Sequence, residues 1–314
     1  MASVTAPYVR EPGWLAARRE RAAVRSRGLE LPRFKGTPGW EFNDLTGLDL
    51  DAFAPATGGD ATAPERAEPL FELPEGASRL EQVDALVASA VEPAEASGAV
   101  VLPLSVAAER FPERVERHLG SVVTADDAFV ARNESAWAGG AFVYVPRGVR
   151  LTAPVFLNVV QDSDSALNWR TLIVLDEGAE AEVWEQYVSS GPEVAGLFNA
   201  VVEISVGPAA ILRYVNGQGL SERTWMFGTQ RAQVERDGSL DWAALGFGSS
   251  HGRCGWRRSW PGRALTRRSP APTRPTGAST STTTPPRSTR RPTAHLTSPS
   301  GGCSTGAPTR SGAA

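Results

Sequence analysis

The sequence is poor in the residue types that bind metals or cross-link small domains. Its 314 residues include only two cysteines and three histidines. Cys254 and Cys303 lie far apart, which excludes a disulfide framework and a cysteine-rich metal site. His118, His251 and His295 are too few for a histidine-rich metal centre. The sequence therefore predicts no metal site in this chain.

Long apolar runs are absent as well. No stretch approaches the about 18 consecutive apolar residues of a membrane-spanning helix, and residues 1–14 lack the apolar core of a signal peptide. These two absences predict a cytoplasmic protein with no membrane partner. The apolar fraction of 41% is nevertheless typical of globular proteins, so the chain can bury a sizeable core in one large domain or two ordinary ones.

Acidic residues are missing from one end of the chain. Residues 253–314 contain 11 arginines and no lysine, aspartate or glutamate, which leaves residues 1–252 with a net charge of −14. An acidic body does not favour nucleic acid. The basic tail could contact phosphates without a fold, but its low apolar content is more typical of a disordered segment. We therefore expect no nucleic-acid partner and a disordered tail over 253–314.

Residues 1–66 are predicted to form a small helical region followed by a linker. Strong helix formers run from Trp14 to Val24, and Gly28 is suited to end that helix. Short turns with scattered aromatic residues follow, and the segment near 54–66 is rich in proline, alanine and glycine.

Residues 67–128 are predicted to be a mixed lead-in of helices and strands. The apolar run at 99–104 predicts a buried strand, and residues 107–117 are helical in type. Pro112 must lie near a helix boundary because proline breaks a helix interior.

Residues 129–252 are predicted to be a β-rich core. Short strands rich in valine, isoleucine and aromatic residues follow one another with almost no helix between them, which favours an all-β body. The predicted strands are 142–145, 154–160, 171–175, 181–188, 200–206 and 211–215.

A weak internal repeat distinguishes two all-β architectures. Turn segments at 176–180, 206–210 and 236–240 each contain glycine and precede a strand, at a spacing of roughly 30 residues that is typical of solenoids. A β-sandwich should instead show several hairpin signals, yet Asn-Gly occurs only at 216–217. The repeat therefore favours a parallel β-helix over a sandwich.

No catalytic motif is present. The sequence lacks a Gly-x-Ser-x-Gly elbow, a phosphate-binding loop ending in Gly-Lys-Ser/Thr and a His-Glu-x-x-His pair. The glycine-rich segment 246–252 has the wrong spacing for a nucleotide loop, so we interpret it as a plain turn. We predict no catalytic residue and assign no cofactor-binding residue.

Individual polar and aromatic residues have structural interpretations. Glu182, Glu185 and Glu203 could be paired carboxylates for glycoside cleavage, but alternating glutamates on strands favour a solvated face. His118 is predicted to be a charge partner at a helix C-terminus. Five tryptophans are predicted to pack in the core rather than to form a sugar platform. They are Trp137, Trp169, Trp184, Trp225 and Trp242.

Residues 8–252 resemble the SufB/SufD family of iron-sulfur cluster assembly proteins. The most recognisable stretch is Trp-Ala-Gly-Gly-Ala-Phe-Val-Tyr-Val-Pro-Arg-Gly-Val at 137–149. The segment 40–45 resembles the family's Trp-x-x-Thr-Asp-Leu element, with Asn43 in place of threonine. Further matching segments are 11–15 with 18 and 22, 127–131, 170–179 and 199–204.

The resemblance implies a right-handed parallel β-helix with a small helical N-terminal region. It also implies a complex with a SufB-like paralogue and a SufC-like ABC ATPase. B-type members usually carry a Gly-Cys-Thr-Ala-Pro-like element where this chain reads Glu-Gln-Tyr-Val-Ser-Ser at 185–190. The chain therefore resembles the D type, which implies a non-catalytic scaffold. No cofactor is then expected to be bound stably by this chain, and the complex handles the iron-sulfur cluster.

Two other functions stay open at this stage. A β-helix polysaccharide-active enzyme would need clustered carboxylates on one face, and a basic-tailed nucleic-acid binder would show steep salt dependence. The sequence does not show the carboxylate cluster, and a pull-down with the ATPase and the B-type partner separates the scaffold from both alternatives.

The tail over 253–314 departs completely from the family, which predicts a frameshift near 252–253. Suitable codons for 253–264, read one frame over, spell Val-Arg-Met-Glu-Thr-Lys-Leu-Ala-Gly-Pro-Gly-Ala, and segments 297–306 and 307–314 also give family-like strings. The β-helix would then lack its last coils, expose an apolar cross-section and support the family's function poorly. The nucleotide sequence across codons 245–260 tests this prediction, which early stops in the alternative frame would contradict.

Overall fold

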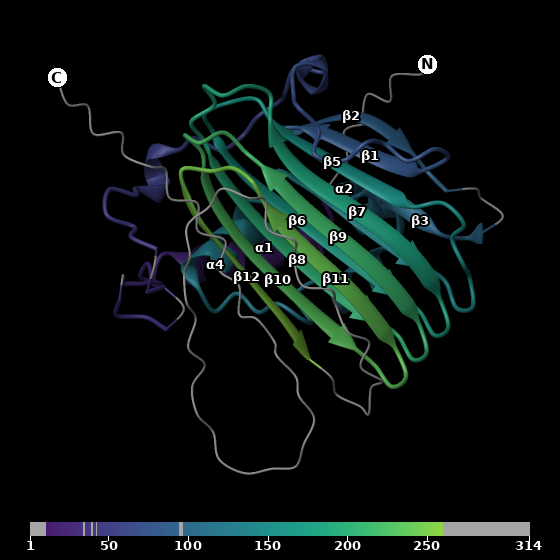
Figure 1. The fold of residues 1–314 in the computed structure, drawn as a ribbon. Helices are drawn as coiled ribbons and strands as arrows, with labels where there is room; N and C mark the ends of the chain where they lie inside the picture. The colour runs from purple at the N-terminus through teal and green to yellow at the C-terminus, as the bar shows by residue number, and fades with distance from the viewer. Residues whose placement is uncertain (1–10, 34, 39, 42, 94–96, 260–314) are drawn as a thin grey trace, which may run out of the picture.

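The structure, a computed structural model, describes residues 11–33, 35–38, 40–41, 43–93 and 97–259. These residues form two six-stranded sheets that face each other, with helices against the outside of one sheet (Figure 1). Sheet A has the strand order β12-β10-β8-β6-β4-β3, and sheet B has the order β11-β9-β7-β5-β1-β2. No helix among the described residues is both long and apolar enough to cross a membrane.

The bounds of the elements follow the predicted order. The helices are α1 (Gly13–Ser26), α2 (Leu104–Arg110), α3 (Pro112–His118) and α4 (Ala128–Ala136), with short 3₁₀ turns at Leu50–Ala52 and Ala63–Glu65. The strands are β1 (Ser78–Val83), β2 (Leu86–Val91), β3 (Val100–Pro103), β4 (Gly139–Val145), β5 (Val155–Gln161), β6 (Ala166–Leu175), β7 (Glu180–Ser189), β8 (Leu197–Val206), β9 (Ile211–Gly219), β10 (Trp225–Val234), β11 (Ser239–Gly246) and β12 (His251–Ser259).

From β4 to β12 the chain alternates between the two sheets, and each strand pairs in parallel with the strand two places along. Leu197 lies opposite Ala166 on one side and Trp225 on the other, so successive coils contain 31 and 28 residues. This spacing is close to the predicted repeat. The architecture is a β-solenoid of about four turns, which confirms the predicted parallel β-helix. At the N-terminal end, β2 and β3 pair antiparallel with β1 and β4.

The corners between sheet A and sheet B stack on one another. Gly148 donates its backbone N–H to Glu177 at 2.9 Å, and the amide of Gly178 donates to Pro208 at 2.8 Å. Each corner needs one residue with positive φ, which is +68° at Gly148 and +67° at Gly178. In the next coil Ala209 takes this position with a φ of 54°. The glycine spacing in the sequence therefore reflects the corners, although the last coils use other residues there.

The space between the sheets is filled by the inward-facing side chains of both. Alternate residues of each strand point inward, and in β8 they include Ala200, Val202 and Ile204, all fully buried. The outward residues of β8 are almost all buried too, because the N-terminal helices cover the outside of sheet A. Double burial explains why these strands read as near-continuous apolar runs.

Polar side chains dock helix α4 onto the outside of sheet A. Asn133 donates to the backbone carbonyls of Trp169 and Asn199 at 2.8 and 2.9 Å. In return, Asn199 donates to the carbonyl of Phe129 at 2.9 Å. These side-chain amides bridge the helix and the sheet in both directions, so they fix where the helix lies on the sheet.

A buried ion pair lies under the same helical region. Arg170 on β6 and Glu203 on β8 are both fully buried, and their side chains are joined at 2.5 Å. Glu203 also accepts the backbone N–H groups of Gly120 and Val123 at 2.9 and 3.1 Å. One carboxylate therefore connects sheet A to the segment between α3 and α4.

Most predicted elements are present, and the structure adds a β-hairpin and a strand that were not predicted. The helix predicted from Trp14 is α1, the helical segment 107–117 is divided into α2 and α3 at Pro112, and the buried strand is β3. The hairpin of β1 and β2 was not predicted. Residues 253–259, assigned to a disordered tail, instead complete strand β12. The reason is that the open edge of β10 offers backbone partners to any chain that can extend beside it. Residues 260–314 lie outside the described residues.

Replacing Glu203 by alanine tests the buried ion pair. The variant removes the nearest carboxylate from the buried guanidinium of Arg170, whose other acidic neighbour, Glu134, lies 3.8 Å away. We therefore expect the free energy of unfolding to fall by about 3–5 kcal/mol. Glu177→Ala is the matched control, because the Arg147–Glu177 pair is exposed and should contribute less than about 1 kcal/mol. Urea denaturation measures both. Equal losses in the two variants would contradict the role given to Glu203.

Ala209 gives an independent test of the corners. Its positive φ is strained for a residue with a Cβ, so Ala209→Gly should stabilise the protein by about 1 kcal/mol. Gly178→Ala at the equivalent corner should destabilise by a similar amount, although the added Cβ would meet nothing closer than 3.9 Å. Thermal unfolding measures both changes, and a loss of stability in Ala209→Gly would contradict the corner geometry.

Candidate functional site

A carboxylate lies buried between the two sheets. The side chain of Glu185 on β7 is inaccessible to solvent and accepts hydrogen bonds from Trp169 Nε1 at 2.7 Å, Thr171 Oγ1 at 2.6 Å and the Tyr214 hydroxyl at 2.5 Å. Burial raises the pKa of Glu185, and these hydrogen bonds only partly oppose that shift. Burial and then the neighbouring Glu185 charge raise the pKa of Tyr214 well above its usual value.

The register between coils extends this polar cluster toward the C-terminal end. Glu185 lies opposite Asn216 on β9, and the Asn216 side chain donates to the Glu185 carbonyl at 3.4 Å. Gln230 on β10 in turn donates to Asn216 Oδ1 at 2.9 Å. Cys254 on β12 packs against the same inner core, and a Cβ added at Gly228 would lie 2.8 Å from its Sγ. We call Trp169, Thr171, Glu185, Tyr214, Asn216 and Gln230 the inner polar cluster.

The prediction of a solvated face for the glutamates was wrong for Glu185 and Glu203. Both are fully buried, on opposite faces of their sheets: Glu185 points into the coil, and Glu203 points outward beneath the helical region. Glu182 alone is partly exposed, and it pairs with Arg213 at 2.8 Å. Sequence alternation shows the period of a strand but not what covers each face. The three carboxylates therefore do not form one glycosidase-like pair.

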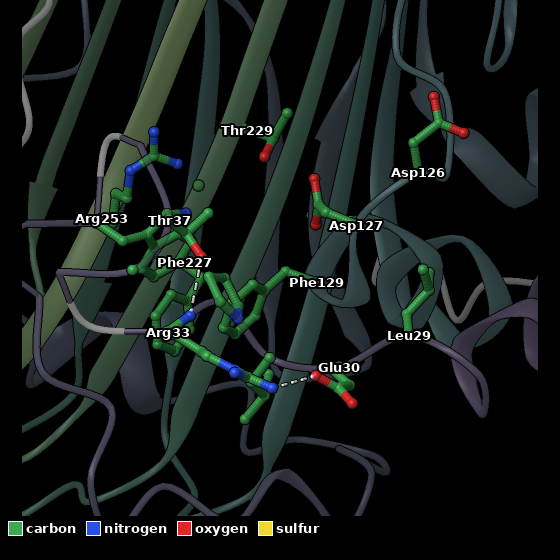
Figure 2. Close-up of a pocket in the computed structure, with 15 residues that line it drawn as sticks. Leu29, Glu30, Arg33, Thr37, Asp126, Asp127, Phe129, Phe227, Thr229 and Arg253 are labelled. Carbon is green, nitrogen blue, oxygen red and sulfur yellow. Dashed lines mark hydrogen bonds and ion pairs between the residues drawn. The ribbon is translucent and has the colours of Figure 1, made fainter.

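A groove lies on the flank of the coil, between the N-terminal segment and strands β10 and β12. We call it the flank groove; it has a volume of about 520 Å³. Figure 2 shows Phe129 and Phe227 at its base, Asp127 facing Thr229, and Arg253 on the opposite side. The lining residues are Leu29–Arg33, Gly36, Thr37, Trp40, Asp126, Asp127, Phe129, Phe227, Gly228, Thr229 and Arg253.

Aromatic rings form the floor of the flank groove. The Trp40 and Phe129 rings stack at 5.5 Å, and the Phe129 and Phe227 rings stack at 4.0 Å. The Arg253 guanidinium lies over the Trp40 ring, 4.7 Å from its centroid. Such a position favours the cation by its interaction with the ring quadrupole. Burial lowers the pKa of Arg253, while the charges of Asp127 and Glu41 oppose that shift.

Most charges around the flank groove have partners. Arg33 pairs with Glu30 at 3.3 Å (Figure 2), and Arg25 pairs with Asp126 at 3.5 Å. Asp127 caps helix α4, because its carboxylate accepts the Val130 backbone N–H at 2.9 Å. The groove joins segments that are far apart in the sequence. No local motif could therefore have indicated it, although Trp40 and Asp127 both lie in segments that carry the family resemblance.

The remaining predicted residues occupy structural positions. His118 ends α3 as expected. Burial and then the Arg117 charge lower its pKa, while the charges of Asp176 and Glu203 oppose that shift. Trp137, Trp169 and Trp242 are buried, and Trp184 and Trp225 are half-buried. Within the glycine-rich segment 246–252, residues 247–250 connect β11 to β12, and a strand rather than a helix follows them.

Potential ligands for a metal do not gather in the described part of the chain. No group of three or more histidine, cysteine, aspartate or glutamate residues there could hold a metal ion. His295 and Cys303 lie outside the described residues.

Glu185→Gln tests the protonation of the inner polar cluster. Because the folded-state pKa of Glu185 is raised, the folded state binds its proton more tightly than the unfolded chain does. The contribution of Glu185 to the free energy of unfolding should therefore be fully present below about the unfolded pKa of 4.5, and should be lost as the pH rises through the folded pKa. The glutamine variant should lose that part of the pH dependence. Urea denaturation over a pH series measures it, and identical slopes for both proteins would contradict the shift.

The fold and both sites can be compared with known proteins. Residues 158–260, which contain β5 from Asn158 through β12, match the family model described as the SufBD core domain of SUF system iron-sulfur cluster assembly. An iron-sulfur cluster assembly SufBD family protein from Staphylococcus aureus strain USA300 is 31% identical over 157 residues, which cover 49% of this chain and 34% of the relative. One from Staphylococcus epidermidis strain RP62A is 27% identical over 258 residues, covering 76% of this chain and 54% of the relative.

The match therefore spans about a third to about half the length of these relatives. It includes the stacked coils that carry both the inner polar cluster and the β10–β12 wall of the flank groove. The agreement between the matched segment and the β-solenoid supports the resemblance seen in the sequence. Over residues 158–260 the chain matches the SufBD core domain, and it is similar to iron-sulfur cluster assembly SufBD family proteins.

Proposed function

We propose that this chain is a SufD-like, non-catalytic scaffold subunit of a cytoplasmic iron-sulfur cluster assembly complex. The observation that carries the proposal is the match of residues 158–260 to the SufBD core domain, because these residues form the stacked coils of the solenoid. In this proposal the partners are a SufB-like paralogue and a SufC-like ABC ATPase. The iron-sulfur cluster is cargo of the complex and is not held stably by this chain.

The D-type assignment rests mainly on the segment 185–190, and the element at 40–45 also suits the D type. Residues 185–190 lie at the end of β7 and just after it, where the sequence reads Glu-Gln-Tyr-Val-Ser-Ser without a cysteine. The inward residues of this segment, Glu185 and Tyr187, belong to the buried interior. They leave this position without the thiol that is usual in the B type, which supports the D type.

A scaffold role agrees with how the carboxylates are used. Glu185 accepts hydrogen bonds inside the coil, Glu203 holds the α3–α4 segment, and Glu182 pairs with Arg213. Each therefore has a structural partner, and the three do not converge on one cavity. A polysaccharide-active enzyme would need such convergence.

Strands β11 and β12 are the terminal strands of the two sheets in the described part of the chain. An edge strand presents a row of backbone donors and acceptors that can pair with another chain. We propose that the sister subunit and the ATPase are held by this end of the solenoid and the residues after it. The altered tail over 253–314 would then weaken that association.

Affinity purification with the B-type subunit and the ATPase of the same genome tests the function. Two tagged proteins are compared: the chain itself, and a version translated in the alternative frame from codon 253. We expect the second protein to retain both partners and the first to retain less of them. Retention of neither partner by the second protein would contradict the scaffold role. Equal retention by both proteins would contradict only the claim that the altered tail weakens the association.

A further inference from the structure

A second cavity continues the flank groove along strands β10 and β12. Its volume is about 410 Å³, and it shares Asp126, Asp127 and Thr229 with the first cavity. Two arginines, Arg231 and Arg257, line it together with three hydroxyl-bearing residues. The hydroxyls belong to Thr124, Thr229 and Ser259. Cation and hydroxyl donors therefore line one open space, together with the Asp126 and Asp127 carboxylates.

The strand register places the two arginines directly opposite each other. Arg231 on β10 pairs with Arg257 on β12, and both lie on the outward face, as do Thr229 and Phe227 earlier on β10. Neighbouring strands are about 4.8 Å apart, so the two guanidinium groups can reach the same ligand. Like charges placed directly opposite on neighbouring strands repel each other and destabilise the pair.

The described residues offer these two arginines no matched acid. Neither Arg231 nor Arg257 forms an ion pair or a side-chain hydrogen bond within the described part of the chain. Asp126 is paired with Arg25, and the Asp127 carboxylate caps α4. Burial and then the neighbouring charge of Arg257 lower the pKa of Arg231, and the charge of Asp127 opposes that shift.

We propose that Arg231 and Arg257 form a binding site for the phosphate group of a small molecule. The planar fork of arginine matches phosphate oxygens bidentately, and the threonine and serine hydroxyls supply further donors. Arg231 lies two residues beyond Thr229 along β10, so the phosphate sits past the point where Asp127 faces Thr229 (Figure 2). The rest of the ligand extends over Thr229 toward the aromatic floor of the flank groove. The two cavities together have the size of a typical small-molecule site.

The site is a property of this polypeptide. Arg231 and Arg257 both lie within residues 158–260, which match the SufBD core domain, but the site is argued from the two arginines of this chain alone. The proposal therefore does not rest on the proposed scaffold function. It depends only on whether Arg231 and Arg257 bind phosphate.

Thermal unfolding and calorimetric titration of the full chain with inorganic phosphate and with glycerol 3-phosphate test the proposal. We expect either probe to raise the melting temperature above that in chloride at equal ionic strength, because a ligand that binds only the folded state stabilises it. Arg257→Gln should fold normally, because it removes a repulsion, and should weaken binding about tenfold. Arg231→Gln should weaken it similarly. Tighter binding of the ester than of inorganic phosphate would support a phosphorylated small molecule as the ligand.

Arg147→Gln is the control, since Arg147 is an exposed corner residue that pairs with Glu177. It should keep the full response to both probes. The proposal is overturned if chloride gives the same stabilisation as phosphate, or if both groove variants bind phosphate as tightly as the control does.

Discussion

The parallel, in-register pairing of successive coils is the constraint on which the rest of this structure depends. Because each coil places its strand beside the equivalent strand of the coil before, residues 26 to 31 positions apart share a row and a face. Trp184, Val215 and Ala243 form one such row on the outside of sheet B. Glu185 and Asn216 form another on the inside. The backbone register therefore fixes which side chains are neighbours, and side-chain chemistry acts only among those neighbours.

The two buried glutamates show what this constraint does to similar residues. Glu203 faces outward under the helices, meets Arg170 and three backbone N–H groups, and joins the helical region to the sheet. Glu185 faces inward among tryptophan, threonine and tyrosine donors, where burial favours its protonated form. Glutamate therefore forms an ion pair that joins the helical region to the outside of sheet A, whereas between the sheets it is a buried hydrogen-bond acceptor.

The sequence predicts the helices and strands better than it predicts how they pair and what covers them. Helix formers from Trp14 onward and β-branched runs such as 200–206 identify elements because both signals are local. The β1–β2 hairpin and residues 253–259 were missed, because their pairing depends on an open edge supplied by distant strands. Burial of Glu185 and Glu203 was missed because a period-2 pattern does not show that both faces are covered. The flank groove unites Trp40, Asp127 and Arg253, which only the fold brings together.

Disulfide trapping between neighbouring coils tests the register most directly. Arg213 and Asp241 are exposed and lie opposite each other on β9 and β11, whereas Ala243 lies opposite Val215. With Cys254 and Cys303 replaced by serine, the pair Arg213→Cys and Asp241→Cys should oxidise readily, since opposite Cα atoms fall within the range of about 4.4–6.8 Å that a disulfide needs. The pair Arg213→Cys and Ala243→Cys should not. Equal cross-linking of both pairs, or of the second alone, would contradict the stacked-coil account.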